Sequence, residues 1–346
     1  MSVRVYAERG LVPPGAPHTP FLEPLWGPSG DKYEDPRSPL AGRFDAWRAE
    51  GAGLLEPAVL AAADVAVLPA GWEHYARVPE RRAAAMEYAK RVRAAGKPLV
   101  AFFVGDSTEP LPLAGAYAFR TSLLRSRRGE REHVLPAFSV DIGPLDVRPW
   151  REKPVVGFCG HVPDRGRPRR AARRLLGRPP HPAHVRTQAC RALLHAREVD
   201  ANVVLRNRYW AGAVGPDGAL DYPAMRQARR EYVDNLANSD YVLAVRGGGN
   251  FSVRLYEALS SGRIPVFVDT DSLLPLEGEI DWSSLCVWLE EPELPELGAR
   301  VAAFHAELGP DGFAERQREC RRVYEQHLAP ERFFRSLADD VHTFEP

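Results

Sequence analysis

The chain has 346 residues, of which 45% are hydrophobic and 27% charged. This composition excludes an intrinsically disordered chain, and the length exceeds what one hydrophobic core usually organises, so we expect two domains. Lys and Arg total 46 and Asp and Glu also total 46, and a net charge of zero gives no reason to expect nucleic acid or an anionic membrane surface as a partner.

The spacing of the cysteines and the length of the apolar runs argue against two further classes, zinc-binding proteins and membrane-spanning proteins. None of the four cysteines belongs to a C-x-x-C pair, which argues against a zinc site. No apolar run reaches the length of a transmembrane helix, and the first nine residues resemble a strand rather than a signal peptide. We therefore expect a cytoplasmic protein without an integral membrane segment. Any contact with the inner membrane would be peripheral, through a substrate.

The first half of the chain alternates between strand and helix patterns. A stretch rich in Pro and Gly, residues 10–43, follows the first strand and cannot form a long helix. The apolar runs after it predict strands at 63–68 and 98–104 and a strand or turn at 117–124, and a charged amphipathic segment predicts a helix at 80–95. This alternation is typical of a parallel sheet with helices on both faces.

The alternation restarts after a linker-like segment at 148–154. We expect strands at 155–159, 202–206, 241–245 and 264–268, helices at 185–194, 222–236 and 252–261, and a mainly helical tail at 311–343. The prediction is an α/β fold with two Rossmann-like domains, 1–147 and 148–346, that face a central cleft. The last helix could pack back on the first domain. Ligands of such sheets bind at the carboxyl ends of the strands.

The segment 239–282 carries the most specific pattern in the chain. A buried strand ends in a glycine run, and a helix follows that Asn250 or Ser252 can cap. Glycines let the backbone approach a ligand closely, and the free N–H groups of a helix N-terminus favour a phosphate. The run consists of Gly247, Gly248 and Gly249.

Charged side chains flank this glycine run. Arg246 precedes it and Arg254 follows it, and guanidinium groups suit phosphate oxygens. Glu257 lies on the same helix face as Arg254, where its carboxylate can accept hydrogen bonds from the hydroxyls of a ribose. Glycines alone would suit an ordinary βαβ turn, but the complete ordered set favours nucleotide binding.

These motifs resemble the exostosin family of glycosyltransferases. The family shows Arg-Gly, then Ser-x-Arg-Leu-x-Glu-Ala, then Gly-x-Ile/Val-Pro-Val, and this chain has the three blocks at 246–247, 252–258 and 262–266. A Leu-Pro-Phe block is similar to 274–276, with Leu in place of Phe, and an Asp-Trp pair lies at 281–282. The match is specific over 239–290 and weaker over 155–238.

Two departures from the family pattern stand out. The usual Cys-Pro pair before Arg-Gly is Ala244-Val245 here. The Golgi anchor of animal and plant members is also missing, so we expect a bacterial, cytoplasmic relative.

The resemblance implies a GT-B fold, with the nucleotide-sugar donor in residues 148–346 and the acceptor mainly in residues 1–147. It implies an inverting transfer to a saccharide, lipid-linked or natural-product acceptor, and no metal or other cofactor. Arg246 and Arg254 would stabilise the departing diphosphate. Gly160, which ends a strand similar to the family's Phe-x-Gly block, and Arg165 would contact the donor as well.

Two other patterns have competing interpretations. Asp269-Thr270-Asp271 mimics a metal-binding Asp-x-Asp, although we favour a strand-end turn because it follows the donor helix. The arginines of 165–178 either grip phosphate, with Arg165, Arg167 and Arg169 nearest to Gly160, or form a solvated face. No aromatic residues interleave this run, so nucleic acid is not expected.

The general base is the least specific assignment. An inverting base in this fold normally comes from the N-terminal domain, and we favour Asp106, which follows the most buried strand. The other candidates are Glu73, His74, Glu109 and His161. Arg120 is a candidate contact for the acceptor or a phosphate.

Two alternatives to the transferase share the fold. One is a hydrolysing nucleotide-sugar epimerase, and the other is a non-catalytic nucleotide-sugar-binding subunit of a glycosyltransferase complex. The sequence identifies neither the sugar nor the acceptor, nor the oligomeric state.

Overall fold

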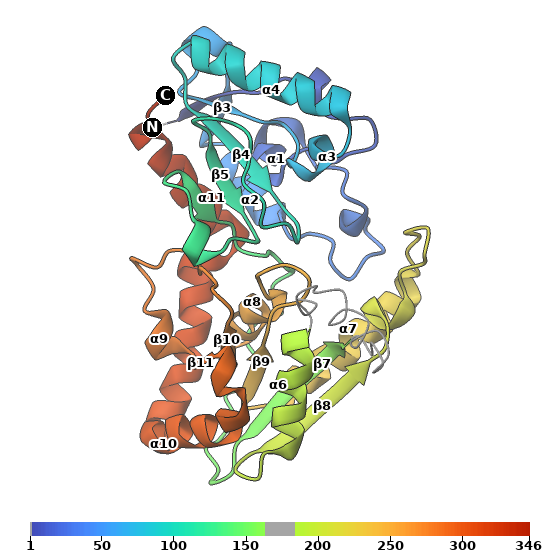
Figure 1. The fold of residues 1–346 in the computed structure, drawn as a ribbon, viewed down its shortest axis with the longest axis vertical. Coiled ribbons are helices and arrows are strands. Elements are labelled where there is room, and N and C mark those ends of the chain that lie inside the picture. Colours follow the sequence, from blue (N-terminus) through green and yellow to red (C-terminus); the bar gives the residue numbers. More distant parts are fainter. Residues whose placement is uncertain (1, 163–183) are drawn as a thin grey trace, which may run out of the picture.

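The computed structural model describes residues 2–162 and 184–346. These residues form two parallel sheets with helices on both faces, one in each half of the molecule (Figure 1). The strand order is β2-β1-β3-β4-β5-β6 in the first sheet and β11-β10-β9-β7-β8 in the second. The predicted α/β architecture with two Rossmann-like halves is confirmed.

In the first half, a six-stranded parallel sheet lies between two layers of helices. Its strands are β1 (Val3–Tyr6), β2 (Leu55–Pro57), β3 (Val65–Val67), β4 (Leu99–Phe103), β5 (Tyr117–Arg120) and β6 (Glu132–Val134). Its helices are α1 (Glu23–Trp26), α2 (Asp45–Gly51), α3 (Glu73–Ala76) and α4 (Pro79–Ala94). The apolar strand β4 is buried on both faces because alternate residues join different cores. Phe102 belongs to the core that contains Trp47 of α2, and Phe103 belongs to the core that contains Tyr88 of α4.

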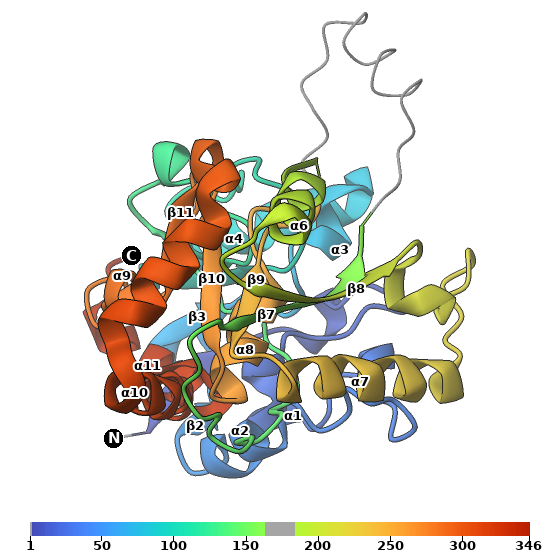
Figure 2. The ribbon, with the colours of Figure 1, turned by 90° about the horizontal axis from the view of Figure 1, so that it is seen from below.

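The second half repeats this plan. Its strands are β7 (Val155–His161), β8 (Asp200–Arg206), β9 (Tyr241–Ala244), β10 (Ile264–Asp269) and β11 (Val287–Glu290). Its helices are α6 (His184–His195), α7 (Tyr222–Ala237), α8 (Val253–Ser260), α9 (Trp282–Leu285) and α10 (Leu297–Val323). Helix α6 covers one face of the sheet, and α7 and α8 cover the other (Figure 2).

Both sheets share one strand order for their first five strands. Each places its second strand beside its first, and then adds the third, fourth and fifth on the other side. The direction of chain winding therefore reverses between β1 and β3 and again between β7 and β9. A crevice suited to a ligand opens at the carboxyl ends of the strands at such a switch point.

The chain returns to the first half at its end (Figure 1). After α10 and the short helix η8 (Tyr324–Leu328), α11 (Pro330–Asp340) places Phe333, Phe334 and Leu337 in the core that contains Trp47. The apolar stripe of α11 drives this packing. The end of the chain therefore stabilises the first half.

Some element boundaries differ from the sequence prediction. Helix α10 begins at Leu297 rather than near 311, and the left-handed Gly309, with φ 59°, interrupts it before Pro310. The Gly-Pro pair conceals the helix because both residues are strong breakers. No helix among the described residues is long and apolar enough to cross a membrane.

Candidate functional site

The carboxyl ends of the two sheets meet at the glycine run. Asp106, which follows β4, packs against Gly248 and Gly249, which follow β9. A Cβ atom at Gly248 would lie 2.2 Å from Oδ2 of Asp106, and one at Gly249 would lie 2.9 Å from its Cα. At Gly249 the neighbouring atom is backbone, so this glycine is required for the approach of the two halves, whereas at Gly248 the Asp106 side chain can rotate away. The structure brings the favoured base candidate directly to the predicted donor loop.

Arg254 from α8 reaches the carboxyl end of β7. Its Nε and Nη2 atoms donate to the carbonyl of Cys159 at 3.2 and 3.1 Å. The guanidinium lies 4.7 Å from the ring of Phe158, and a Cβ at Gly160 would lie 1.8 Å from Nη2. Gly160 and Arg254, which the sequence singled out in separate motifs, are in contact.

Arg186, near the start of α6, spans the switch point of the second sheet. Its Nη1 donates to the carbonyl of His161 at 3.1 Å, and its Nη2 donates to the carbonyl of Val245 at 3.4 Å. It also lies beside Gly247, where a Cβ would be 2.7 Å from Nη2. Sequence reasoning missed Arg186. The available signal was its position at the start of a helix that follows a parallel strand.

We call three arginines at this switch point, Arg186, Arg246 and Arg254, the arginine cluster, because each contacts the glycine run or a strand end beside it. The Nη2 of Arg246 donates to the carbonyl of Gly248 at 3.3 Å. In the described ranges none of the three arginines forms an ion pair. The Nε atoms of Arg246 and Arg186 and the hydroxyl of Ser252, the residue before α8, are buried without a hydrogen-bond partner.

The electrostatics of this cluster favour an anion. Burial lowers the pKa of Arg246, and burial together with the charge of Arg254 lowers the pKa of Arg186. The charges of Asp106 and Glu291 oppose this effect only in part, and an anionic ligand at a helix N-terminus would further offset the cost of part-buried cations without an ion pair. The cluster is therefore a candidate phosphate site.

Glu257 has protein partners for its carboxylate. It is 7% exposed, accepts a hydrogen bond from Oγ of Ser139 at 2.8 Å and forms an ion pair with Arg229 of α7. Burial opposes its ionisation, but the charge of Arg229 and these hydrogen bonds outweigh burial and lower the pKa of Glu257. Its contact with a ribose stays a prediction.

Asn250 connects the donor loop to the first half. Its backbone N–H donates to Oγ of Ser122 at 2.8 Å, and its Nδ2 donates to the carbonyls of Leu123 at 3.2 Å and Asp271 at 3.0 Å. The side chain thus joins three segments of the chain. Its contact with the donor also stays a prediction.

The Asp-x-Asp segment faces the first half as well. Asp269 forms an ion pair with Arg125 at 2.9 Å and accepts from the backbone N–H of Ser272 at 2.7 Å. Asp271 accepts from the backbone N–H of Ser126 at 3.0 Å and from its hydroxyl. Each carboxylate therefore has a partner residue in the first half. Among the described residues no group of three or more His, Cys, Asp or Glu is placed to hold a metal ion.

The remaining base candidates differ in their surroundings. Oε2 of Glu73 accepts from the backbone N–H of Val104 at 3.1 Å, and burial raises the pKa of Glu73 to about 7. Burial lowers the pKa of His74, whose Nε2 lies 3.5 Å from Oε1 of Glu73. His161 ends β7, and its carbonyl accepts from Arg186.

Arg120 supports the loop after β4, which carries the base candidates Asp106 and Glu109. The buried guanidinium forms an ion pair with Glu132 at 2.5 Å and donates to the carbonyls of Ser107 at 3.1 Å and Glu109 at 2.7 Å. These partners occupy its terminal nitrogens. Arg165, Arg167 and Arg169 lie outside the described residues.

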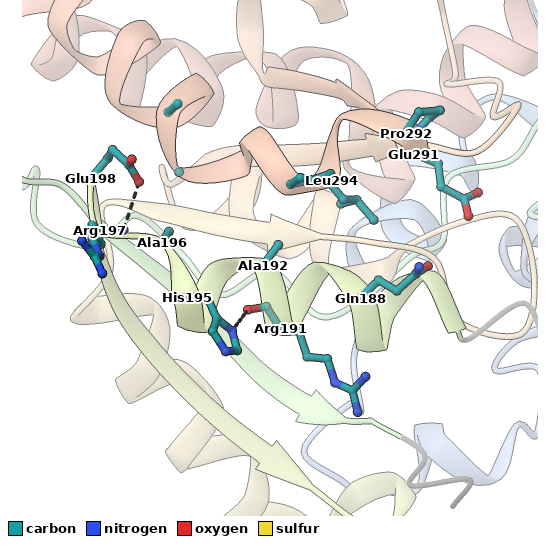
Figure 3. Close-up of a pocket in the computed structure, with 13 residues that line it drawn as sticks. Gln188, Arg191, Ala192, His195, Ala196, Arg197, Glu198, Glu291, Pro292 and Leu294 are labelled. Carbon is teal, nitrogen blue, oxygen red and sulfur yellow. Dashed lines mark hydrogen bonds between the residues drawn. The ribbon is translucent and has the colours of Figure 1, made fainter. Parts of the chain in front are cut away.

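A cavity of about 820 Å³ lies between α6 and the segment that begins with the short helix η7 (Glu291–Glu296) (Figure 3). Gln188 and Glu291 lie at one end of this cavity and Glu198 at the other. The charge of Glu291 acts on Arg246. None of the three arginines of the cluster is among the described residues that line this cavity, which extends along α6.

Fold and site together define an α/β protein with a candidate anion site at a switch point. Residues 119–304, more than half of the chain, match the family described as the exostosin GT47 domain. The chain belongs to this family, as its motifs indicated.

The relatives match over short segments. The chain is 32% identical over 103 residues to "Exostosin-1 homolog" of Caenorhabditis elegans, covering 29% of this chain and 25% of the relative. It is 29% identical over 92 residues to "Probable glucuronosyltransferase GUT1" of Oryza sativa subsp. japonica, covering 27% and 21%. It is 30% identical over 77 residues to "Probable beta-1,4-xylosyltransferase IRX10" of Arabidopsis thaliana, covering 22% and 19%. The matched segments therefore span a quarter or less of these relatives.

Two solved structures share a distant likeness. TarM aligns with a TM-score of 0.38 and 10% identity, over 73% of this chain and 57% of TarM. CalG4, the calicheamicin glycosyltransferase, aligns with a TM-score of 0.32 and 14% identity, over 82% of this chain and 75% of CalG4. A likeness this distant identifies neither activity nor substrate.

Proposed function

We propose that the protein is a glycosyltransferase that takes a sugar from a nucleoside diphosphate donor held by Arg186, Arg246 and Arg254. The observation that carries this proposal is a set of three part-buried arginines around a glycine loop, none of which forms an ion pair in the described ranges. A diphosphate supplies the missing negative charge, and both the arginines and the start of α8 can donate to its oxygens.

The candidate donor sugars are suggested by the names of two relatives rather than by the site. Two relatives are named as a glucuronosyltransferase and a xylosyltransferase. UDP-glucuronic acid and UDP-xylose are therefore the first donors to test, and the acceptor class is a saccharide, a lipid-linked sugar or a natural product.

We further propose that the transfer inverts the anomeric centre in one displacement. The acceptor hydroxyl approaches from the first half, where Asp106 lies against the donor loop, and the diphosphate leaves toward the arginines of the second half. Positioning both reactants removes much of the entropic barrier, and fixed cations stabilise the charge that grows on the leaving group. In this proposal the arginines perform the task that a metal ion performs in other glycosyltransferases.

Nucleotide binding tests the donor site directly. UDP, GDP and ADP are each added at millimolar concentration while thermal unfolding is followed. A nucleoside diphosphate at one hundred times its dissociation constant should stabilise the fold by about 2.7 kcal/mol. Arg254→Ala should remove this stabilisation, whereas Arg318→Ala, an exposed arginine on α10, should retain it. If none of these nucleotides stabilises the protein, the donor site is wrong.

Release of UDP from the two donors tests the activity. Turnover supports the transferase. Nucleotide binding without any release of UDP would instead favour the non-catalytic donor-binding subunit, and interconversion of the free nucleotide sugars would favour the epimerase.

A further inference from the structure

Glu73 differs from the other part-buried carboxylates of the first half. Glu8 pairs with Arg91, Glu34 with Arg43, Glu132 with Arg120 and Glu23 with Arg48. Glu73 has no Lys or Arg partner among the residues that the structure describes, and its ion-pair contact is with the imidazole of His74 at 3.5 Å. Buried carboxylates are usually paired with a cation, and such pairing does not explain the position of Glu73.

Backbone groups around Glu73 fix the position of its carboxylate. Oε2 accepts from the backbone N–H of Val104 at 3.1 Å. The carboxylate folds back over Gly71, where a Cβ would lie 2.3 Å from Oε1. The side chain is nevertheless 29% exposed. The carboxylate is therefore fixed in one orientation and still reachable by a ligand.

Glu73 lies on the edge of the first sheet that meets the donor loop. Val104 directly follows β4, and Asp106, two residues later, packs against Gly248 and Gly249. Consecutive Cα atoms are about 3.8 Å apart, so the peptide that binds Glu73 lies within about 8 Å of the Cα of Asp106. The Glu73 carboxylate therefore lies beside the carboxyl end of β4, the strand end that leads to Asp106 and the donor loop.

We propose that Glu73 is the general base that deprotonates the acceptor hydroxyl, an assignment that rests on the proposed glycosyltransferase function. The acceptor O–H gives its proton to the Glu73 carboxylate while its oxygen forms a bond to the anomeric carbon. The bond from that carbon to the diphosphate oxygen breaks, and its electron pair leaves with the nucleoside diphosphate. Glu73 then returns the proton to solvent.

Asp106 takes a different role in this arrangement. Its carboxylate lies against Gly248, and its charge acts on both Arg186 and Arg246. This position suits a residue that positions the donor loop and its arginines. Asp106 stays the alternative base, and the experiment below separates the two carboxylates.

The surroundings of Glu73 set the expected pH dependence. Burial raises the pKa of Glu73 to about 7, which is close to the value that general-base catalysis favours near neutral pH. The facing groups are His74 and Tyr75, with Asp31 and Arg81 acting on His74. Burial favours the neutral forms of His74 and Tyr75. A base works only when ionised, so kcat/KM should rise as pH increases through about 7.

The test compares Glu73→Gln with wild type and with the exposed control Glu80→Gln in the full chain. The measurements are UDP release from UDP-xylose and UDP-glucuronic acid, with water as acceptor, and thermal stabilisation by UDP. Glu73→Gln should release UDP about 10²–10⁴-fold more slowly and lose the pH-dependent limb near 7. It should bind UDP as wild type does, and Glu80→Gln should match wild type throughout. Glu73→Asp, which keeps a carboxylate, should recover part of the rate.

Three outcomes would overturn the assignment. In the first, Glu73→Gln keeps its rate and its pH limb. In the second, Asp106→Asn removes the limb while Glu73→Gln retains it, which would make Asp106 the base. In the third, wild type binds UDP but releases none from either donor, and then the proposed function fails together with its base.

Discussion

The two sheets share one strand order, yet the loops at their facing carboxyl ends carry opposite charges. The edge of the first sheet presents the carboxylates of Glu73 and Asp106, whereas the switch point of the second gathers Arg186, Arg246 and Arg254. Strand order therefore determines where a site can form, and the side chains on the loops determine what it binds. In the proposed function, a proton acceptor in the first half would face the leaving diphosphate in the second half.

A second difference separates the arginines themselves. Arg229, Arg120 and Arg125 are bound to carboxylates that hold the fold or the two halves together. The three arginines at the switch point donate to backbone carbonyls instead. Paired arginines should affect stability when they are removed, and unpaired ones should affect ligand chemistry. The predictions below test this distinction, from the largest expected effect to the smallest.

The Glu257–Arg229 pair should show the largest loss of stability. Replacing either residue with Ala leaves a buried charge without its partner, and such losses cost about 3–5 kcal/mol. Considered on its helix alone, Glu257 would look dispensable for folding. The measurement is the denaturant midpoint of Glu257→Ala, of Arg229→Ala and of the double variant.

The double variant should lose less than the sum of the single variants, because it leaves no unpaired charge. If Glu257→Ala instead keeps the stability of wild type and weakens only nucleotide binding, Glu257 belongs with the ligand residues, as the sequence predicted.

Arg246 and Arg254 should show the opposite pattern. We expect Arg254→Ala and Arg246→Ala to reduce turnover by about 10²–10³, the usual effect of losing one donor to a charge that grows in the transition state. Their thermal stability without nucleotide should change little, because no carboxylate partner is left behind. UDP release is measured with and without excess EDTA, and activity should persist in the chelator.

Activity that EDTA abolishes and magnesium or manganese restores would contradict this mechanism. It would also draw attention back to Asp269 and Asp271. Their carboxylates would then have to exchange Arg125 and Ser126 for the metal.

The sequence predicted those parts of the molecule that local patterns determine. Apolar runs located the buried parallel strands, and two separate motifs identified Gly160 and Arg254, which are in contact. Contacts between distant segments left no local signal. The bond from Asn250 to Ser122 joins residues 128 positions apart, and the Glu257–Ser139 bond spans 118. For the same reason, the residue pattern of α8 could not predict that Arg229 forms an ion pair with the Glu257 carboxylate.

The smallest expected effect concerns the contact between the two edges. A Cβ at Gly248 would lie 2.2 Å from Oδ2 of Asp106, so in Gly248→Ala the two halves must separate slightly or the Asp106 side chain must rotate. Overpacking of this kind costs about 1–3 kcal/mol. Gly278→Ala is the matched control, because a Cβ at that glycine would meet no atom within 4 Å. The free energy of unfolding is measured for both variants and for Gly248→Ala combined with Asp106→Ala. The combination should recover most of the loss, since it removes the clashing carboxylate. If Gly248→Ala is as stable as Gly278→Ala, the two edges do not press together at this point, and the opposed charges would act across a wider gap than the structure shows.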